Sequence, residues 1–350
     1  MNLKTIRDID VKDKTVLVRV DYNVPIKNGE VESDLRISAS LPTIQFLLDG
    51  GAKKVVLISH LGRPEGKENP EFSLKPAVEC LRALLPGPEI GFFEIKKGQH
   101  LVDLSNCRVA LLENLRFDPR EEANDAEFAK EIIDFTGAEL FVQDGFAVVH
   151  RAHASTDAIT KLLPSYAGLL LEKEINGLSK VIDNPERPLL MIIGGAKVED
   201  KAPLIEKFVG LADQIAVGGK IAADGYTNSS DKIYVADDFD EDTAGAKLDV
   251  GPSSTIKIAE MIQGAKTVVW NGLLGKAEDA AYATSSTIVA ELMGESADKT
   301  TVICGGDTTG FVEQMMLEHP QLKYSLVSTG GGAALEFLLG KDLPGLAGLK

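Results

Sequence analysis

The sequence has little cysteine, which argues against two kinds of stabilisation. Its 350 residues include three cysteines, Cys80, Cys107 and Cys304, which lie far apart in the chain. They form no CxxC pair and no Cys/His spacing of the kind that binds zinc. We therefore expect neither a disulfide framework nor a structural zinc site, and we predict that the thiols are buried.

The sequence also lacks an excess of positive charge and any long apolar run. Asp and Glu number 53 against 37 Lys and Arg, which gives a formal net charge of −16 at pH 7. An acidic surface is a poor partner for nucleic acid or an anionic membrane, because phosphate groups require a basic face. The opening segment MNLKTIRDIDVKDK has no apolar stretch of the signal-peptide kind. These features predict a cytoplasmic protein with no nucleic-acid or membrane partner.

What the sequence does contain is an alternation of short apolar runs with helical segments. Buried strands are predicted at 14–20, 54–59, 108–113, 139–143, 189–193, 214–217, 266–270 and 300–304. A helix is predicted over 38–49, and Asn124 followed by Glu127 has the form of a capping box. A chain of this length with 44% hydrophobic residues normally divides into two domains. The pattern therefore predicts an α/β fold with a parallel sheet in each half.

Basic side chains follow the predicted strands of the first half. They are Arg36, His60, Arg63, Arg116, Arg151 and His153. An open parallel sheet binds ligands outside the carboxyl ends of its strands, and guanidinium groups suit carboxylate and phosphate oxygens. Each arginine taken alone fits a surface residue or a structural ion pair equally well, and each histidine fits a neutral hydrogen-bonded side chain. Taken together, they favour a site for a small, multiply anionic ligand.

Glycine-rich turns follow the predicted strands of the second half. They begin at Gly194, Gly218, Gly305 and Gly330, and the last of them precedes a helix predicted to open near Ala333. Such a turn can leave backbone N–H groups open to a phosphate, although a plain strand-to-helix turn has the same composition. Lys197 and Lys201 are four residues apart, so both amines can face one site. Two lysines at a solvated helix start have the same spacing, however, so the spacing alone does not decide between the two interpretations. No GxxxxGK[ST] motif occurs, so the pattern differs from a P-loop.

Several segments along the whole chain resemble the signature segments of the phosphoglycerate kinase family. They are DYNVP (21–25), SHLGRP (59–64), LLENLRF (111–117), HRAHAS (150–155), GGAKVEDK (194–201), WNG (270–272), GGDTT (305–309) and STGGGAALE (328–336). The resemblance implies an α/β fold of two doubly wound parallel-sheet (Rossmann-like) domains joined by a helix, with a cleft between them. The implied ranges are 1–158 for a 3-phosphoglycerate-binding domain, 159–184 for the interdomain helix, 185–336 for a nucleotide-binding domain and 337–350 for a segment that returns to the first domain.

The same resemblance implies an activity and a cofactor. The reaction would be the reversible transfer of a phosphoryl group between ATP and the carboxylate of 3-phosphoglycerate, a step of glycolysis and gluconeogenesis, with 1,3-bisphosphoglycerate and ADP as the other pair. Mg²⁺ would accompany the nucleotide, and a monomer would work by hinge-bending of its two domains. A carboxylate nucleophile is already ionised, so no general base is required.

Residue roles are also implied by the resemblance. For 3-phosphoglycerate they fall on Asp21, Asn23, Arg36, His60, Arg63, Arg116 and Arg151. For the nucleotide they fall on Gly195, Lys197, Lys201, Gly218, Gly219, Asn271, Glu278, Gly305, Gly306, Asp307 and Thr308, with Glu278 at the ribose and Asp307 at the metal. The implied catalytic groups are Arg36, Lys197, Lys201, Gly331 and Gly332.

The chain departs from the family most clearly between Gly219 and Ala236. There the chain is shorter than the family pattern by some tens of residues, close to the implied adenine pocket. Lys220 also stands within a segment that in the family pattern is rich in glycine and methionine. The base preference and the role of Glu278 therefore stay open. The alternative function is a catalytically weakened relative that binds nucleotide or a protein partner. A dinucleotide-dependent oxidoreductase would have GxGxxG after the first strand, where RVDYNVP stands instead.

Overall fold

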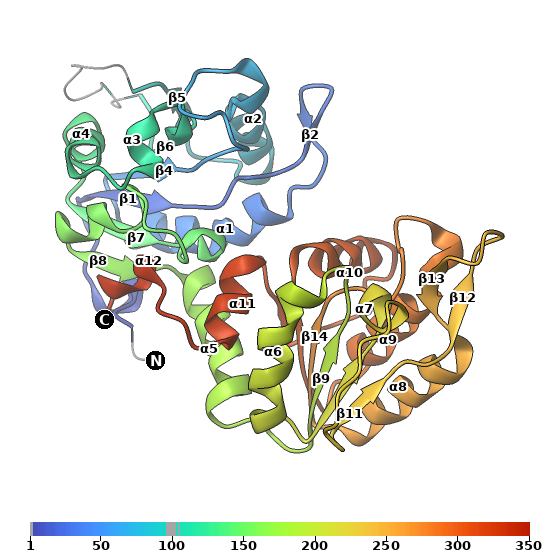
Figure 1. Ribbon diagram of the computed structural model, residues 1–350. Helices are drawn as coiled ribbons and strands as arrows, with labels where there is room; N and C mark the ends of the chain where they lie inside the picture. The colour runs from blue at the N-terminus through green and yellow to red at the C-terminus, as the bar shows by residue number, and fades with distance from the viewer. Residues whose placement is uncertain (1–2, 96–102, 104–105) are drawn as a thin grey trace. The chain divides into compact units, whose positions relative to one another are not determined.

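The chain forms two compact units in this computed structural model, which describes residues 3–95, 103 and 106–350. The N-terminal unit comprises Met1–Ile175 with Asp342–Lys350, and the C-terminal unit comprises Asn176–Lys341. Within the described residues, each unit contains one six-stranded sheet whose strand pairings are all parallel (Figure 1). The apolar runs of the sequence form these strands.

The sheet of the N-terminal unit has the order β5-β6-β4-β1-β7-β8. Its strands are β1 (Thr15–Arg19), β4 (Lys54–Ile58), β5 (Ile90–Phe93), β6 (Val109–Leu112), β7 (Leu140–Gln143) and β8 (Ser165–Ala167), with β2 (Ile26–Lys27) and β3 (Glu30–Val31) forming a separate hairpin. The helices are α1 (Leu35–Asp49), α2 (Lys75–Leu84), α3 (Pro119–Glu122), α4 (Ala126–Thr136), the first part of α5 (Leu169–Asp183) and α12 (Pro344–Ala347).

Both faces of this sheet are buried, and alternate residues of each strand face opposite cores. Val16 and Val18 of β1 pack in the core that contains residues of α1 and α2, whereas Leu17 packs in the core of α4. This alternation follows from the two-residue period of a strand, and burial on both faces explains why the strands read as continuous apolar runs. Arg19 ends β1 and is fully buried despite its charge.

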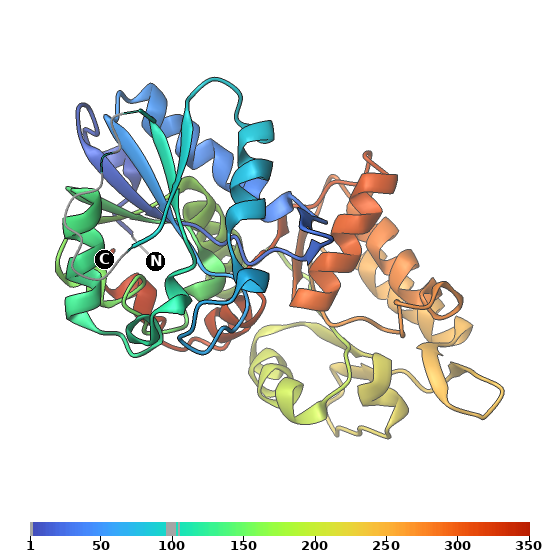
Figure 2. The same ribbon diagram turned by 90° about the horizontal axis from the view of Figure 1, so that it is seen from above.

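The sheet of the C-terminal unit has the order β11-β10-β9-β14-β15-β16. Its strands are β9 (Leu189–Ile193), β10 (Gln214–Val217), β11 (Ile233–Val235), β14 (Thr267–Asn271), β15 (Thr300–Cys304) and β16 (Leu326–Val327), while β12 (Phe239–Glu241) and β13 (Lys247–Val250) pair antiparallel. The helices are α6 (Val198–Leu211), α7 (Gly219–Ala223), α8 (Pro252–Gly264), α9 (Thr284–Gly294), α10 (Gly306–Glu318), α11 (Gly332–Leu338) and the rest of α5. The hairpin of β12 and β13 extends from the body of this unit (Figures 1 and 2).

The helix expected over 159–184 is wrong at its start. Ser165–Ala167 forms strand β8, which pairs with β7, and α5 begins only at Leu169. The partner strand β7 is more than twenty positions away in the sequence, so the apolar periodicity of the segment could not reveal this pairing. The last residues of the chain, Asp342–Lys350, belong to the N-terminal unit, where Lys4 N–H donates to the carbonyl of Leu349 at 2.8 Å.

The predicted capping box at Asn124 is also wrong. Asn124 has a left-handed φ of 56°, and the residue that caps α4 is Asp125, whose side chain accepts a hydrogen bond from the Phe128 N–H at 2.8 Å. The Asn124 side chain instead contacts Asp157 and the N–H of Ala158. A shift of one position therefore moves the cap from an amide to a carboxylate, which also suits the positive end of the helix.

A buried carboxylate, Asp144, caps the start of α5. Its Oδ1 accepts hydrogen bonds from the N–H groups of Leu170 and Leu171 at 3.0 and 3.3 Å. Burial raises the pKa of Asp144 to about 7, against an ordinary value of 3.8, because the charged form loses its hydration. The hydrogen bonds from Thr43 and the backbone act in the opposite direction but are the weaker influence.

We predict that Asp144 makes the protein less stable as the pH rises from about 4 to about 7. The folded chain keeps this proton up to about pH 7 whereas the unfolded chain releases it near 3.8, so folding binds a proton in this window. Asp144→Asn keeps the acceptor oxygen and removes the titration. Urea unfolding at pH 5 and pH 8 should show the variant gaining stability relative to wild type at pH 8. A difference that is the same at both pH values would contradict the raised pKa.

Candidate functional site

Each sheet has one point where the strand order reverses, and the predicted site residues gather beside it. In the N-terminal unit the reversal lies between β1 and β7, and in the C-terminal unit it lies between β9 and β14. Crevices at the carboxyl ends of strands at such points are the usual ligand sites of open α/β sheets. The two sites are described separately below.

The loop after β1 is tied to the start of α1. An oxygen of Asp21 accepts a hydrogen bond from Arg36, and the other accepts one from the N–H of Asn23 at 3.3 Å. The sequence pattern predicted that Arg36 follows a strand. Arg36 instead lies in the first turn of helix α1. Asp21 is buried, while the Arg36 side chain is one-third exposed. The carboxylate therefore holds the guanidinium group in place at the surface of the site.

The loop after β4 is held from two sides by predicted site residues. Asn23 Oδ1 accepts a hydrogen bond from the Gly62 N–H at 2.9 Å, and Arg116 Nη1 donates to the Gly62 carbonyl at 2.8 Å. Arg63, the next residue, is exposed. The structure thus brings Asn23, Arg63 and Arg116 to one place, although they come from three different strand ends.

The ring of His60 is oriented by a buried arginine that the sequence analysis did not single out. Arg19 Nη2 lies 3.2 Å from His60 Nδ1. Burial, followed by the nearby charges of Arg19, Arg116 and Arg151, holds the pKa of His60 well below its ordinary value, so the ring is neutral near pH 7. Because a guanidinium group can only donate, Nδ1 must accept and the ring proton must lie on Nε2. His60 is thereby prepared to donate one hydrogen bond to an anion.

Arg116 is the most deeply buried of the predicted arginines. Its exposed fraction is 4%, and burial, only partly offset by the charge of Glu122, lowers its pKa to about 10. Nε lies 3.1 Å from Glu122 without the alignment of a hydrogen bond, and the buried Nη2 has no hydrogen-bond partner among the described residues. A desolvated cation with an unused N–H group is costly unless an anion binds to it.

A second histidine, His153, lies in the same cluster of cations. Burial, with the charges of Arg116, Arg19 and Arg151, lowers its pKa to about 3, so it is neutral near pH 7. We refer to the arginines Arg19, Arg116 and Arg151 as the cation cluster, and the neutral rings of His60 and His153 lie beside it. Its mutual repulsion is what a binding site for a multiply charged anion requires.

One buried carboxylate lies behind the cation cluster. Glu121 is fully buried, accepts hydrogen bonds from the hydroxyl and the N–H of Ser155, and has a raised pKa, because its burial outweighs the attraction of Arg19. Neither Glu121 nor Arg19 was predicted as a site residue. The sequence could have indicated Arg19, since a single charge at the end of an otherwise apolar strand is unusual. No feature of the sequence indicated Glu121.

In the C-terminal unit, the loops after β9 and β14 touch through glycine backbones. Gly194 N–H donates to the Asn271 carbonyl at 3.0 Å, and Gly195 N–H donates to the Leu273 carbonyl at 2.8 Å. A Cβ atom at Gly194 would collide with the carbonyls of Leu273 and Gly272, and one at Gly272 would collide with Gly194. We call this contact the glycine seam. It explains why no side chain is present at the point where the strand order reverses.

A cavity of about 450 Å³ opens beside the glycine seam and collects most of the predicted nucleotide residues. Its lining comprises Gly195, Ala196, Lys197, Lys201, Asn271, Gly272, Gly305, Gly306, Asp307, Thr308, Gly331, Gly332 and Leu335. We call it the lysine–glycine cavity. Lys197 immediately precedes α6, Asp307 lies in the first turn of α10, and Gly331 immediately precedes α11. The cavity is therefore walled by the starts of helices, whose N–H groups favour anions.

Hydrogen bonds beneath this cavity fix its polar floor. Lys201 donates to the side-chain oxygen of Asn271, whose Nδ2 in turn lies 3.3 Å from the sulfur of Cys304. The hydroxyl of Thr308 accepts a hydrogen bond from the Gly272 N–H at 2.8 Å. Asn271 and Thr308 are each only 1% exposed, so their first role is to hold the floor rigid.

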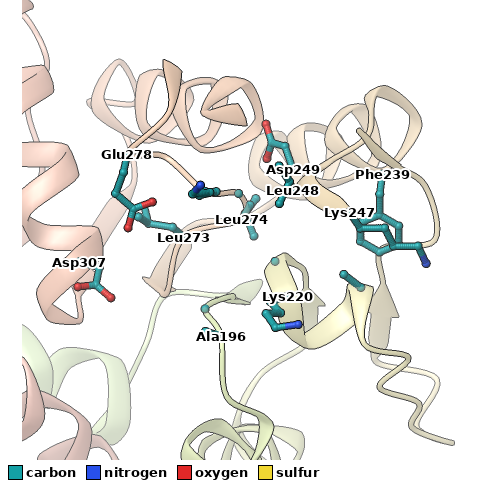
Figure 3. Close-up of a pocket in the computed structure, with 15 residues that line it drawn as sticks. Ala196, Lys220, Phe239, Lys247, Leu248, Asp249, Leu273, Leu274, Glu278 and Asp307 are labelled. Atoms are coloured by element: carbon teal, nitrogen blue, oxygen red, sulfur yellow. The ribbon is translucent and has the colours of Figure 1, made fainter. Parts of the chain in front are cut away.

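A second cavity, of about 250 Å³, continues from the first toward the β12–β13 hairpin. The two share Gly195, Ala196 and Asp307, and Gly219 and Glu278 line the second. We call it the hairpin cavity. Figure 3 shows Asp307 and Glu278 at one end of it and Phe239 and Lys247 at the other. Gly218 alone of the predicted nucleotide residues lines neither cavity.

The position of Gly218 has a simple explanation. It lies one residue before α7, and a Cβ atom there would meet Leu274 at 2.7 Å. Leu274 is buried and lines the hairpin cavity. Gly218 therefore supports the cavity wall from behind instead of facing a ligand.

No group of three or more His, Cys, Asp or Glu side chains among the described residues is arranged to hold a metal ion. Asp307 stands as an exposed carboxylate in both cavities. One carboxylate is enough for a Mg²⁺ ion that takes its other ligands from phosphates and water. None of the described helices has the length and apolar character needed to span a bilayer.

Together, the fold and the two sites define a two-unit α/β protein with a cluster of buried arginines in one unit and a cavity walled by helix starts in the other. The family model for phosphoglycerate kinase matches residues 6–227 and 223–341. The chain therefore belongs to the phosphoglycerate kinase family.

Individual relatives agree over the full length of the chain. The chain is 41% identical to the phosphoglycerate kinase of Fervidobacterium nodosum over 401 aligned positions, with 100% of this chain and 98% of the relative covered. It is 40% identical to that of Chloroflexus aurantiacus, with 100% and 99% covered. Among solved structures, the phosphoglycerate kinase of Coxiella burnetii superposes with a TM-score of 0.81 at 33% identity, with 99% of both chains covered. That of Pyrococcus horikoshii gives a TM-score of 0.84 at 26% identity, with 99% and 98% covered.

The same comparisons support the short segment expected after Gly219. The alignment to the Fervidobacterium relative has 401 positions for a chain of 350 residues. The two parts of the family match overlap at residues 223–227, which begin at the last residue of α7. The chain passes from α7 to β11 in this region without a further helix among the described residues.

Proposed function

We propose that this chain catalyses the reversible transfer of a phosphoryl group between ATP and the carboxylate of 3-phosphoglycerate. Membership of the family supports the reaction, and the lysine–glycine cavity is the observation that supports it within this chain. Two lysines, one carboxylate and glycine turns at three helix starts line one cavity there. Phosphoryl transfer is catalysed mainly by positioning and by charge, and this lining supplies both.

The residue roles in this proposal follow the two sites. In the N-terminal unit, Asp21, Asn23, His60, Arg63, Arg116 and Arg151 would bind 3-phosphoglycerate, with Arg36 near the carboxylate that receives the phosphoryl group. In the C-terminal unit, Lys201, Asn271, Thr308 and the glycines Gly195, Gly219, Gly305 and Gly306 would surround the nucleotide, with Glu278 at its ribose. Lys197, Gly331 and Gly332 would lie where charge develops during transfer. Gly218 would act only by supporting the wall.

A magnesium ion fits this arrangement as a companion of the nucleotide. Asp307 would hold it, and the ion would neutralise charge on the phosphate oxygens. The substrate carboxylate is ionised at neutral pH, so this chain's residues need not remove a proton. Their work is to bind, to orient and to exclude water.

A coupled assay with 3-phosphoglycerate and Mg-ATP tests the proposal directly. We expect formation of an acyl phosphate, trapped as its hydroxamate with hydroxylamine, and loss of that product when EDTA removes the metal. Folded protein that yields no product with ATP or GTP would overturn the proposal. In that case the chain would be a relative that binds nucleotide or a protein partner without catalysis.

We predict that Arg151→Ala raises the KM for 3-phosphoglycerate about tenfold and leaves kcat nearly unchanged, as expected for loss of one charge-assisted hydrogen bond. Arg151 is half-buried, and its Nε donates to His150. Arg7→Ala, which removes an arginine paired with Glu172, is the matched control. An unchanged KM in the Arg151 variant would remove this residue from the site.

A cytoplasmic monomer is also part of the proposal. None of the three cysteines, all of which lie in the described residues, forms a disulfide, which suits a reducing compartment. Light scattering coupled to gel filtration tests the oligomeric state. A mass near 37.5 kDa is expected for the monomer, and a mass of twice that value would contradict it.

A further inference from the structure

The buried carboxylate of Glu121 joins two segments that carry arginines of the cation cluster. Glu121 lies in α3, which follows Arg116 closely in the chain. Its Oε1 accepts a hydrogen bond from the hydroxyl of Ser155 at 2.5 Å, and its Oε2 accepts one from the N–H of Ser155 at 3.1 Å. Ser155 closes the segment 150–155, which contains Arg151. The carboxylate therefore ties the segment of Arg151 to the segment of Arg116.

The segment 150–155 is braced by hydrogen bonds of its own. The hydroxyl of Thr156 accepts a hydrogen bond from the His153 N–H at 3.0 Å and donates one to the Arg151 carbonyl at 2.7 Å. The Arg151 N–H donates to the carbonyl of Val148 at 3.0 Å. Because these bonds fix the shape of the segment, its attachment to Glu121 influences where Arg151 lies.

Arg116 and Arg151 need such an attachment, because like charges repel. Arg151 is close enough to Arg116 to contribute, after burial, to the lowered pKa of Arg116. Two cations that lie together in the unliganded protein must be held there by other contacts. An anion that binds to both then finds them already in place.

Two roles for a carboxylate behind these arginines predict opposite effects on anion binding. A counter-charge competes with the bound anion, so its removal would strengthen binding. An anchor keeps the arginines in position, so its removal would weaken binding. The sign of the change in affinity therefore distinguishes the two roles.

The contacts of Glu121 favour the anchor. Ser155 uses both carboxylate oxygens, and the Glu121 backbone carbonyl accepts a further hydrogen bond from the Ala154 N–H at 2.9 Å. In the described part of the chain, the only basic side chain within ion-pair distance of Glu121 is His153, whose Nδ1 lies 3.9 Å from Oε1 and whose ring is neutral near pH 7. The carboxylate thus holds backbone and hydroxyl groups of the loop and pairs directly with no arginine.

We propose that Glu121 is a positioning residue for 3-phosphoglycerate, which holds Arg151 in the acid-substrate site through Ser155. The inference rests on the proposed function for the identity of the anion. The anchoring contacts themselves are independent of it.

The test measures the Kd of 3-phosphoglycerate by calorimetry, without nucleotide, in Glu121→Ala and Glu121→Gln. Glu121→Ala removes the anchor and should raise the Kd about tenfold, the loss expected for one charge-assisted hydrogen bond. In Glu121→Gln the amide oxygen can accept from the Ser155 N–H while the amide nitrogen donates to the Ser155 hydroxyl. The anchor is then kept, and the Kd should be no higher than that of wild type.

Asp249→Ala is the matched control. Asp249 is 2% exposed, lies in the C-terminal unit and accepts hydrogen bonds from the hydroxyl and the N–H of one serine, Ser285. Its loss removes the same kind of buried contact far from the arginines in the sequence. The Kd of 3-phosphoglycerate should equal that of wild type.

A double variant shows whether Glu121 acts through Arg151. In an Arg151→Ala background, Glu121→Ala should leave the Kd nearly unchanged, because the contact that it supports is already gone. Equal losses in both backgrounds would overturn the inference. Tighter binding by Glu121→Ala would also overturn it, since Glu121 would then be a counter-charge. So would an unchanged Kd with a lower melting temperature, which would make the residue purely structural.

These measurements are separate from the proposed activity, because binding requires no turnover. An Arg151-dependent loss of affinity in a protein that forms no acyl phosphate would sustain the inference and overturn the activity. If wild type bound no 3-phosphoglycerate, the proposed function would be wrong. Titration of the same variants with inorganic pyrophosphate would then decide the inference by the same criteria.

Discussion

Replacing Lys197 with alanine is expected to lower kcat by about 10²–10³-fold, the usual loss when one preorganised charge contact is removed from a transition state. Lys197 is exposed, lines the lysine–glycine cavity and immediately precedes α6 without capping the helix with its side chain. No structural role therefore explains the position of Lys197. A contact that strengthens only as charge moves to the transferring group affects turnover and leaves ground-state binding nearly intact.

The measurement is steady-state kinetics together with the Kd of ADP and of 3-phosphoglycerate. Lys207→Ala, an exposed lysine of the same helix outside both cavities, is the control and should behave as wild type. If the Lys197 variant lost as much in nucleotide affinity as in kcat, the lysine would serve uniform binding and the proposed role would be wrong.

Replacing Arg116 with methionine should raise the KM for 3-phosphoglycerate by ~10²-fold, since two hydrogen bonds to a charged group are lost at once. The same change should leave the melting temperature of the unliganded protein nearly unchanged, because relief of the buried charge offsets loss of the hydrogen bond from Arg116 Nη1 to the Gly62 carbonyl. Arg116 is buried among other cations, with an N–H group that has no partner among the described residues, and a similar apolar volume removes that cost. Its carboxylate partner Glu122 is 46% exposed and can return to water.

The combination of weaker binding and unimpaired stability is the signature of a residue kept for its ligand. Arg116→Lys serves as the second variant, because it keeps the charge and loses the planar fork. Its KM should lie between those of wild type and Arg116→Met. A fall of many degrees in the melting temperature with an unchanged KM would show that Arg116 is structural.

The central strands of the sheets were predictable because they are buried on both faces, whereas the partly exposed edge strands β5 and β11 were not predicted. A run such as Leu189–Ile193, in which every residue is buried, is hardly compatible with anything but a central strand. Strand β8 was missed because Ser165–Ala167 is short, only partly apolar and defined by its pairing with β7. Local patterns report local structure, and this pairing is not local.

The site residues also divide into those that a sequence motif indicates and those that only tertiary contacts indicate. Residues within glycine-rich or basic motifs, such as Lys197 and Arg116, could be named from the sequence, and the structure places each beside its neighbours in the predicted set. Arg19 and Glu121 were not named as site residues, because their importance comes from what they touch. A buried guanidinium acting on a histidine and a carboxylate behind cations both depend on tertiary contacts.

The glycine seam between β9 and β14 has a consequence for how this protein can be altered. A methyl group on either side of the seam would collide with the opposite backbone, so almost no other residue can replace Gly194 or Gly272. The hairpin of Phe239 and Lys247 has no such constraint, as both residues are at least partly exposed. Libraries that aim to reshape the hairpin cavity should therefore leave the seam untouched and diversify the hairpin, whose Phe239 and Lys247 line that cavity. The two cavities share Gly195, Ala196 and Asp307. The hairpin cavity can nevertheless change readily by mutation, whereas the lysine–glycine cavity beside the seam cannot.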